Sequence, residues 1–86
     1  MRVSVVSPEQ AVFDGEADAL VAPAFDGLVG ILPRHAPFLT LLGEGVLVVR
    51  RGGEVRRFRV SGGFLQVVRA GGDTVRVVAD RVTPFS

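Results

Sequence analysis

Turn signals recur at short intervals along this chain, and they restrict its secondary structure more than any other feature. They stand at Ser7-Pro8, Asp14-Gly15, Asp26-Gly27, Arg34 to Pro37, Gly43 to Gly45, Gly52-Gly53, Gly62-Gly63 and Gly71-Gly72. The runs between them are short and rich in valine, a β-branched residue that favours strands. No window carries a helical apolar stripe long enough to compete. The pattern therefore predicts an all-β domain, either a sandwich or a barrel.

The length and composition of the chain set further limits. Its 86 residues suffice for one domain with a modest core, and a hydrophobic content of 48% is typical of a folded chain. There is no cysteine, which excludes disulfides, thiol nucleophiles and cysteine metal sites. Apolar stretches such as 19–22 and 46–49 are too short to span a membrane, and the first residues lack the apolar segment of a signal peptide. We therefore expect a soluble intracellular protein.

A first hairpin can be predicted with its register. Gly52-Gly53 lies between two apolar runs, and a two-residue turn there makes Arg51 face Glu54 and Leu47 face Phe58. One side of this hairpin is apolar and is predicted to face the core: Leu47, Val49, Phe58 and Val60. The other side mixes three valines with three arginines: Val46, Val48, Val55, Arg50, Arg57 and Arg59.

Gly71-Gly72 predicts a second hairpin of the same kind. Its expected core side holds Phe64, Val68, Val75, Val77 and Ala79, with Gln66 among them. Its opposite side holds Leu65, Val67, Val78, Arg69, Thr74 and Arg76. A strand that faces water alternates more cleanly than either outer side does. Two interpretations stay open: a surface that another protein covers, or a second core layer or tolerated surface.

The segment 31–42 is unusual because it is both irregular and apolar. Pro33 and Pro37 prevent a regular helix or a central strand there. Four apolar residues follow at once: Phe38, Leu39, Leu41 and Leu42. We expect such a segment to be tucked over the core, presented to a partner, or divided between the two.

Catalytic groups are scarce. His35 is the single histidine and cannot form a multi-histidine metal site, so it is interpreted as a loop histidine or an interface residue. The serines lie outside any nucleophile motif, and without lysine there is no phosphate-binding P-loop. We therefore predict no catalytic, cofactor-binding or metal-binding residue and no enzymatic activity in this chain.

Binding of single-stranded nucleic acid is the alternative function. Five arginines cluster in the first hairpin: Arg50, Arg51, Arg56, Arg57 and Arg59. A basic hairpin on a small β-barrel can follow a nucleic acid backbone. The chain has no Trp or Tyr for base stacking, however, and Phe58 and Phe64 are predicted to be in the core.

Several segments, taken together, resemble the epsilon subunit of F-type ATP synthases. The most specific is Gly30 to Pro37, Gly-Ile-Leu-Pro-Arg-His-Ala-Pro, followed by Phe38-Leu39-Thr40. The others are Val5 to Glu9, Phe13 to Ala17, Ser61-Gly62-Gly63-Phe64-Leu65 and Val78-Ala79-Asp80. Their order and spacing extend the resemblance over nearly the whole chain.

The resemblance implies a flattened ten-stranded β-sandwich over residues 1–80, with a short C-terminal tail over 81–86. It implies a non-catalytic rotor subunit of the central stalk, held between the gamma subunit and the ring of c subunits, that couples rotation to ATP synthesis. Such a protein lies at the cytoplasmic face of a bacterial plasma membrane, with no membrane insertion, cofactor, small-molecule ligand or nucleic acid. By resemblance, Asp26, Gly27 and Leu28 meet the c-ring. His35, Ala36, Pro37, Phe38, Leu39 and Thr40 lie against gamma.

The chain departs from the family pattern in three places. Leu28 stands where many members carry a second acidic residue, so Asp26 alone would supply the charge for a basic loop of the ring. Gln66 occupies the position of a usual glutamate. The sequence stops at Ser86, where most bacterial members continue into a helical hairpin that inhibits ATP hydrolysis and in some binds ATP. We therefore expect neither that inhibition nor that ATP site.

Overall fold

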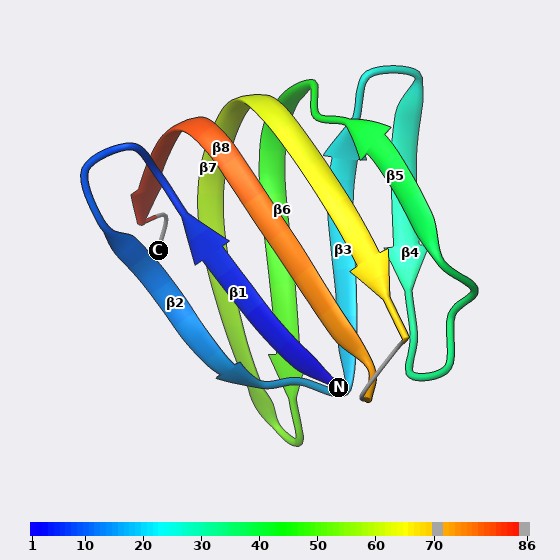
Figure 1. The fold of residues 1–86 in the computed structure, drawn as a ribbon. Coiled ribbons are helices and arrows are strands. Elements are labelled where there is room, and N and C mark those ends of the chain that lie inside the picture. Colours follow the sequence, from blue (N-terminus) through cyan, green and yellow to red (C-terminus); the bar gives the residue numbers. More distant parts are fainter. Residues whose placement is uncertain (70–71, 85–86) are drawn as a thin grey trace.

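The computed structural model describes residues 1–69 and 72–84, which form eight β-strands (Figure 1). The strands are β1 (Arg2–Val6), β2 (Ala11–Glu16), β3 (Ala19–Ala24), β4 (Gly27–Ile31), β5 (Phe38–Leu41), β6 (Glu44–Arg51), β7 (Glu54–Val68) and β8 (Thr74–Pro84). They pair in the order β2-β1-β8-β7-β6-β3-β4, and β5 pairs with β7 off this path. Across the described ranges we find no helix of the length and apolarity needed to cross a bilayer. The prediction of an all-β domain is confirmed.

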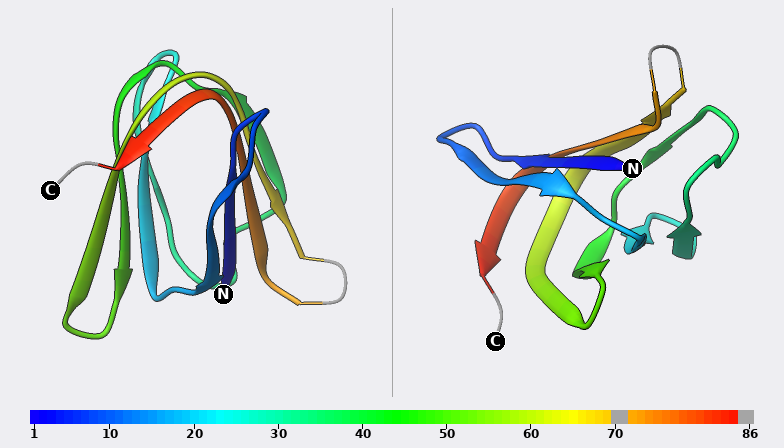
Figure 2. Two further views of the ribbon diagram at one scale, coloured as in Figure 1. Left: turned by 90° about the vertical axis from the view of Figure 1, so that its left-hand side faces the viewer. Right: turned by 90° about the horizontal axis from the view of Figure 1, so that it is seen from below.

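The two longest strands belong to both layers of a sandwich. Residues 54–61 of β7 pair with β6, whereas residues 64–67 pair with β5. Residues 74–78 of β8 pair with β1, and residues 81–84 pair only with the first half of β7. Figure 2 shows both strands arching from one layer to the other. Counting their halves separately gives two layers of five and explains the ten strands that the resemblance implies.

We call these layers A and B. Layer A consists of β2, β1, residues 74–79 of β8, residues 63–68 of β7, and β5. Layer B consists of residues 81–84 of β8, residues 54–61 of β7, β6, β3 and β4. The apolar inner faces of the two layers form one core, whose largest fully buried side chains are Phe58, Leu20, Ile31, Leu47, Leu65, Val3, Val5, Val49, Val60, Val75 and Val77. Among the described residues, no polar or charged side chain is buried.

The first hairpin has the predicted register. Arg51 pairs with Glu54, Leu47 with Phe58, and the ladder continues with the same offset to the end of β6. All four side chains of the predicted core side are buried: Leu47, Val49, Phe58 and Val60. The segment just before β3 holds this turn, since Gly52 N–H donates a hydrogen bond of 2.6 Å to Asp18 Oδ2.

The predicted register of the second hairpin is wrong by one residue. Leu65 pairs with Val77 and Val67 with Val75, so Leu65 and Val67 are buried. Phe64 and Val68, which the sequence placed in the core, lie on the outer side of layer A. The last pair before the reversal is Val68 with Thr74, so five residues separate the strands instead of the expected two. Because side chains alternate along a strand, the slip of one residue exchanges the two faces of β7, whereas Val75, Val77 and Ala79 of β8 are buried as predicted. Part of the expected turn, Gly71, lies outside the described residues.

Gly62 and Gly63 do not form the predicted turn but lie inside β7, at the point where the strand passes between layers. Their φ angles are 71° and 102°, in the left-handed region that favours glycine. A Cβ on Gly63 would collide with the carbonyl oxygen of Val78. These glycines therefore bend β7 from layer B into layer A. Opposite the bend, β8 continues through Arg81–Pro84, so these residues form strand and not the C-terminal tail that the resemblance implies.

Candidate functional site

Strand β5 divides the predicted gamma-binding segment between two faces. Its pairing with β7 sets Phe38 opposite Val67 and Thr40 opposite Leu65, both of which point inward. Phe38 is half-buried and packs against the core. Leu39 and Leu41 point outward and are 65% and 63% exposed. The segment is thus both tucked over the core and presented outward, by alternate side chains.

His35 lies in the loop before β5 and organises that loop. Its Nδ1–H donates a hydrogen bond of 2.7 Å to the carbonyl oxygen of Ala36, and its backbone N–H donates one of 3.1 Å to Leu32. Its ring lies edge-on to the ring of Phe38, with the centroids 5.6 Å apart. These are the contacts of a structural loop histidine. Within residues 1–69 and 72–84, no group of three or more His, Asp or Glu residues could hold a metal ion.

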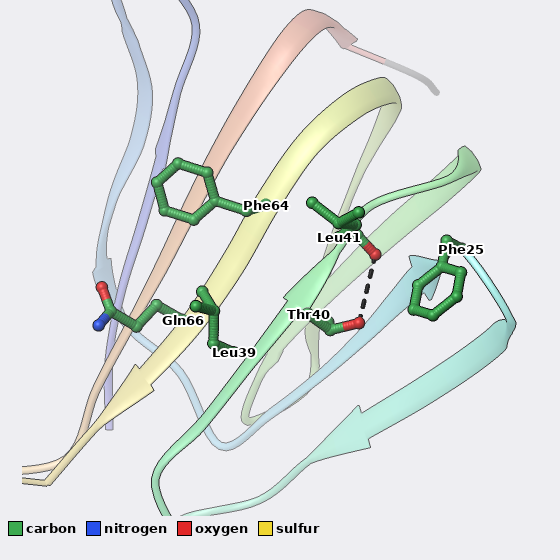
Figure 3. Close-up of a pocket in the computed structure, with 6 residues that line it drawn as sticks. All are labelled: Phe25, Leu39, Thr40, Leu41, Phe64 and Gln66. Atoms are coloured by element: carbon green, nitrogen blue, oxygen red, sulfur yellow. Dashed lines mark hydrogen bonds between the residues drawn. The ribbon is translucent and has the colours of Figure 1, made fainter.

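The outward side chains of β5 belong to an open apolar pocket on layer A. It is lined by Phe25, Leu39, Thr40, Leu41, Phe64 and Gln66 (Figure 3). Figure 3 shows that these residues come from the β3–β4 turn, β5 and β7. A second depression adjoins it across β8 and β1 and shares Phe64 and Gln66 with it. We call this combined surface the apolar face of layer A; its exposed or half-buried apolar members are Val6, Phe25, Leu39, Leu41, Phe64 and Val78.

The predicted c-ring contact lies at the tip of the β3–β4 hairpin. Ala24 pairs with Gly27, so Phe25 and Asp26 form the two-residue turn. Leu28 is 76% exposed, and Asp26 is also exposed. The turn is attached to β5, because the N–H of Phe25 donates a hydrogen bond of 3.0 Å to the carbonyl oxygen of Leu41. The predicted c-ring turn therefore borders the apolar face of layer A.

The outer side of layer B has a different character. On β6 and β7, each valine of this side pairs with an arginine: Val46 with Arg59, Val48 with Arg57 and Val55 with Arg50. The other two arginines of the hairpin lie on its opposite side. The guanidinium carbon of Arg56 stands 5.6 Å from the ring centroids of both Phe13 and Phe58. The five arginines considered for nucleic acid binding are thus divided between two sides of the hairpin.

Sequence reasoning missed Phe25 and Phe64 as surface residues. Phe64 was placed in the core because the assumed turn length inverted the faces of β7. Phe25 had a recognisable signal, since it directly precedes the Asp26-Gly27 turn, and a large apolar residue at such a position is exposed unless a partner covers it. In the structure it is 66% exposed.

Comparison with known proteins identifies relatives of this domain. The model of the β-sandwich domain of the ATP synthase delta/epsilon chain matches residues 1–85. The ATP synthase epsilon chain of Leptospira borgpetersenii is 44% identical over 80 residues, which cover 93% of this chain and 61% of that one. The epsilon chain of Desulforamulus reducens is 50% identical over 66 residues, covering 77% of this chain and 50% of that one. The chain therefore spans about half to three fifths of these relatives' length.

Solved structures share the fold. One is a chain of the mitochondrial ATP synthase of Euglena gracilis, with a TM-score of 0.85, 24% identity, and 95% of this chain and 51% of that one covered. Another is from the central stalk and c-ring of the Tetrahymena thermophila mitochondrial ATP synthase, with a TM-score of 0.80, 19% identity, and 96% and 65% covered. Because the family match includes every strand of the sandwich, this chain belongs to the family of β-sandwich domains of ATP synthase delta/epsilon chains.

Proposed function

We propose that this domain is a non-catalytic rotor component of an ATP synthase that joins the gamma subunit to the ring of c subunits. The observation that carries the proposal is the apolar face of layer A, where Phe25, Leu39 and Leu41 are each more than three-fifths exposed. Soluble monomers rarely expose a large contiguous apolar patch, and such patches commonly mark a site where a partner binds. In a member of this family, such a surface fits the neighbouring stalk subunit.

The contact with gamma is proposed for the segment 35–40 together with the rest of the apolar face. Leu39 makes the direct contact, and Leu41 extends it beyond the predicted segment. Phe38 packs against the core and supports the strand, and Thr40 lines the open pocket beside the two leucines. The loop residues His35, Ala36 and Pro37 contribute at one end of the surface. A few side chains that the partner buries completely, near the centre of the contact, carry most of the binding free energy of such an interface.

The contact with the c-ring is proposed for Asp26, Gly27 and Leu28. The hairpin tip presents the carboxylate of Asp26 to a basic loop of the ring, and Leu28 adds apolar contact next to it. Because this turn is hydrogen-bonded to β5, the two proposed interfaces belong to one continuous surface.

The domain would then sit at the cytoplasmic face of the membrane and transmit torque through a close-packed core, without binding substrate, cofactor or nucleic acid.

The test is binding to the cognate gamma subunit, measured by calorimetry and pull-down. Replacing both outward leucines, Leu39→Thr with Leu41→Thr, should weaken the complex by at least about tenfold, because each leucine loses apolar contact worth about 1 kcal/mol or more. The matched control is Val46→Thr with Val48→Thr on the outer side of layer B, which should leave the affinity unchanged. Phe38 is not suitable for this test because it packs against the core.

Two results would overturn the proposal. One is that the folded, unaltered domain forms no complex with gamma at micromolar concentration. The other is that the layer B control weakens binding as much as the leucine variant does, which would move the interface to the opposite face. Thermal unfolding of each variant shows that the loss of binding is not a loss of folding.

A further inference from the structure

The loop that leads into β5 is hydrogen-bonded to the side-chain carboxylate of Asp73, the residue directly before β8. The N–H of Arg34 donates a hydrogen bond of 2.8 Å to Asp73 Oδ2. The other oxygen, Asp73 Oδ1, accepts a hydrogen bond of 3.2 Å from Nε of Arg69. Arg69 in turn donates through Nη1 to the carbonyl oxygen of Arg34, at 3.5 Å. The ion pair of Asp73 and Arg69 thus holds both polar groups of the Arg34 backbone.

The fastened residue has a strained backbone. Arg34 has a φ of 70°. Among residues 1–69 and 72–84, no other residue apart from glycines has a positive φ. This conformation costs a side-chain-bearing residue about 1–2 kcal/mol, so it persists where surrounding contacts impose it. The hydrogen bonds from the Asp73 and Arg69 side chains are such contacts. They are charge-assisted, and the side chain of Asp73 is only 24% exposed.

Asp73 is itself held in place by the fold. The carbonyl oxygen of Asp73 accepts a hydrogen bond of 2.9 Å from the N–H of Arg2, which ties it to the start of β1. From Arg34 the constraint passes along the chain. The N–H of His35 closes the turn onto Leu32, and the His35 ring packs against Phe38, the first residue of β5.

We propose that Asp73 and Arg69 are positioning residues that hold the loop 32–37 in the shape required for binding gamma. The inference rests on the proposed function, because the loop and β5 carry the segment assigned to gamma. A loop that is ordered before binding loses less conformational entropy when the partner docks. The Asp73–Arg69 pair therefore raises the affinity for gamma without contacting gamma itself.

The first measurement is amide hydrogen exchange in the free domain. Asp73→Ala should speed exchange at Arg34 and His35 by about tenfold or more, because the hydrogen bond that holds the Arg34 N–H is removed. Exchange at Phe25, whose N–H bonds Leu41, should not change. The matched control is Asp14→Ala, which removes an exposed carboxylate paired with Arg2 at 3.0 Å on the edge of the sheet. It changes the net charge equally and should leave the loop unaffected.

The second measurement is the affinity for gamma. Asp73→Ala should weaken binding by about tenfold, and Asp73→Asn, which keeps an acceptor for Arg34 but loses the ion pair, by about threefold. If both variants bind as the unaltered domain does while exchange in the loop is faster, the positioning role is refuted and the proposed function stands. If hydrogen exchange in the loop does not respond to Asp73→Ala, the Asp73–Arg69 pair does not hold the loop, and the proposal is refuted whatever the affinity for gamma. If the unaltered domain does not bind gamma, the proposed function fails, and the positioning role for gamma fails with it even where exchange responds.

Discussion

Phe64 and Leu65 are neighbours on β7 that lie on opposite sides of layer A, and truncating each tests the register of the β7–β8 hairpin. Leu65 has an exposed fraction of 0% and lies between the layers, opposite Val77. Phe64 is half-buried and lines both depressions of the apolar face. If side-chain size decided the outcome, Phe64→Ala would be the more damaging change. The structure predicts the reverse.

The expected magnitudes follow from burial. Leu65→Ala removes most of a fully buried side chain and leaves a cavity in a two-layer core, so we expect the free energy of unfolding to fall by about 3 kcal/mol. Phe64→Ala leaves no enclosed cavity, because water can enter the space above layer A. We expect its cost to be about 1 kcal/mol.

Urea denaturation followed by circular dichroism measures both costs. For a domain of this size the slope is about 1–1.5 kcal/mol per molar urea, so Leu65→Ala should lower the midpoint by about 2–3 M and Phe64→Ala by less than about 1 M. The slope should be the same for both variants. If Phe64→Ala lowers the free energy of unfolding as much as Leu65→Ala does, then Phe64 faces the core and the register inferred from Gly71-Gly72 is right. In that case Phe64 does not belong to the apolar face of layer A.

Two further predictions concern the bend in β7 and the edge of the core. Gly63→Ala should destabilise the domain by about 3 kcal/mol or more, because a Cβ would collide with the carbonyl of Val78 at a left-handed φ, whereas Gly53→Ala at an open turn position should cost under about 1 kcal/mol. Equal thermal unfolding of the two variants would contradict the role of Gly63 in the bend. Arg56→Ala should cost about 0.5–1 kcal/mol through its lost contact with two phenylalanine rings, and Arg57→Ala almost nothing. Chemical denaturation that ranks these arginines the other way would refute that contact.

The first hairpin could be predicted from the sequence residue by residue. A two-residue glycine turn leaves one way to pair the flanking strands, and the apolar side that follows from Gly52-Gly53 is the side that is buried. The alternation of valine and arginine on the other side was equally readable. In this region local turn geometry and burial lead to the same register, so each confirms the other.

The second hairpin could not be predicted in this way. Two arrangements of Phe64, Leu65 and Val67 place a similar number of apolar residues inside, so the apolar pattern does not choose between them. The choice depends on the length of the reversal between Val68 and Thr74, and the residues there fit more than one length. The same uncertainty hid the outer position of Phe64, and with it most of the apolar face.

Gly62 and Gly63 show a second limit of sequence reading. A glycine pair between apolar runs indicates a backbone with unusual dihedral angles, but it does not say whether the chain reverses or only bends. Tertiary contacts decide between a reversal and a bend. Leu42 and Gly43 hydrogen-bond to this pair, so the connection between β5 and β6 lies beside the bend in β7. Two segments of chain therefore change layer together, which a single sequence cannot reveal.

The pairing of β1 with β8 has a consequence for the order in which the chain folds on a ribosome. β1 is synthesised before every other strand of the domain, yet its parallel partner, residues 74–78, belongs to β8, the last strand of the sandwich. Until those residues emerge, β1 and β2 form an isolated hairpin, which is marginally stable in water. The antiparallel neighbours β3, β4, β6 and β7 can assemble earlier through shorter loops. Layer A is therefore completed only after β8 has emerged from the ribosome, and until then the first hairpin of the nascent domain stays exposed.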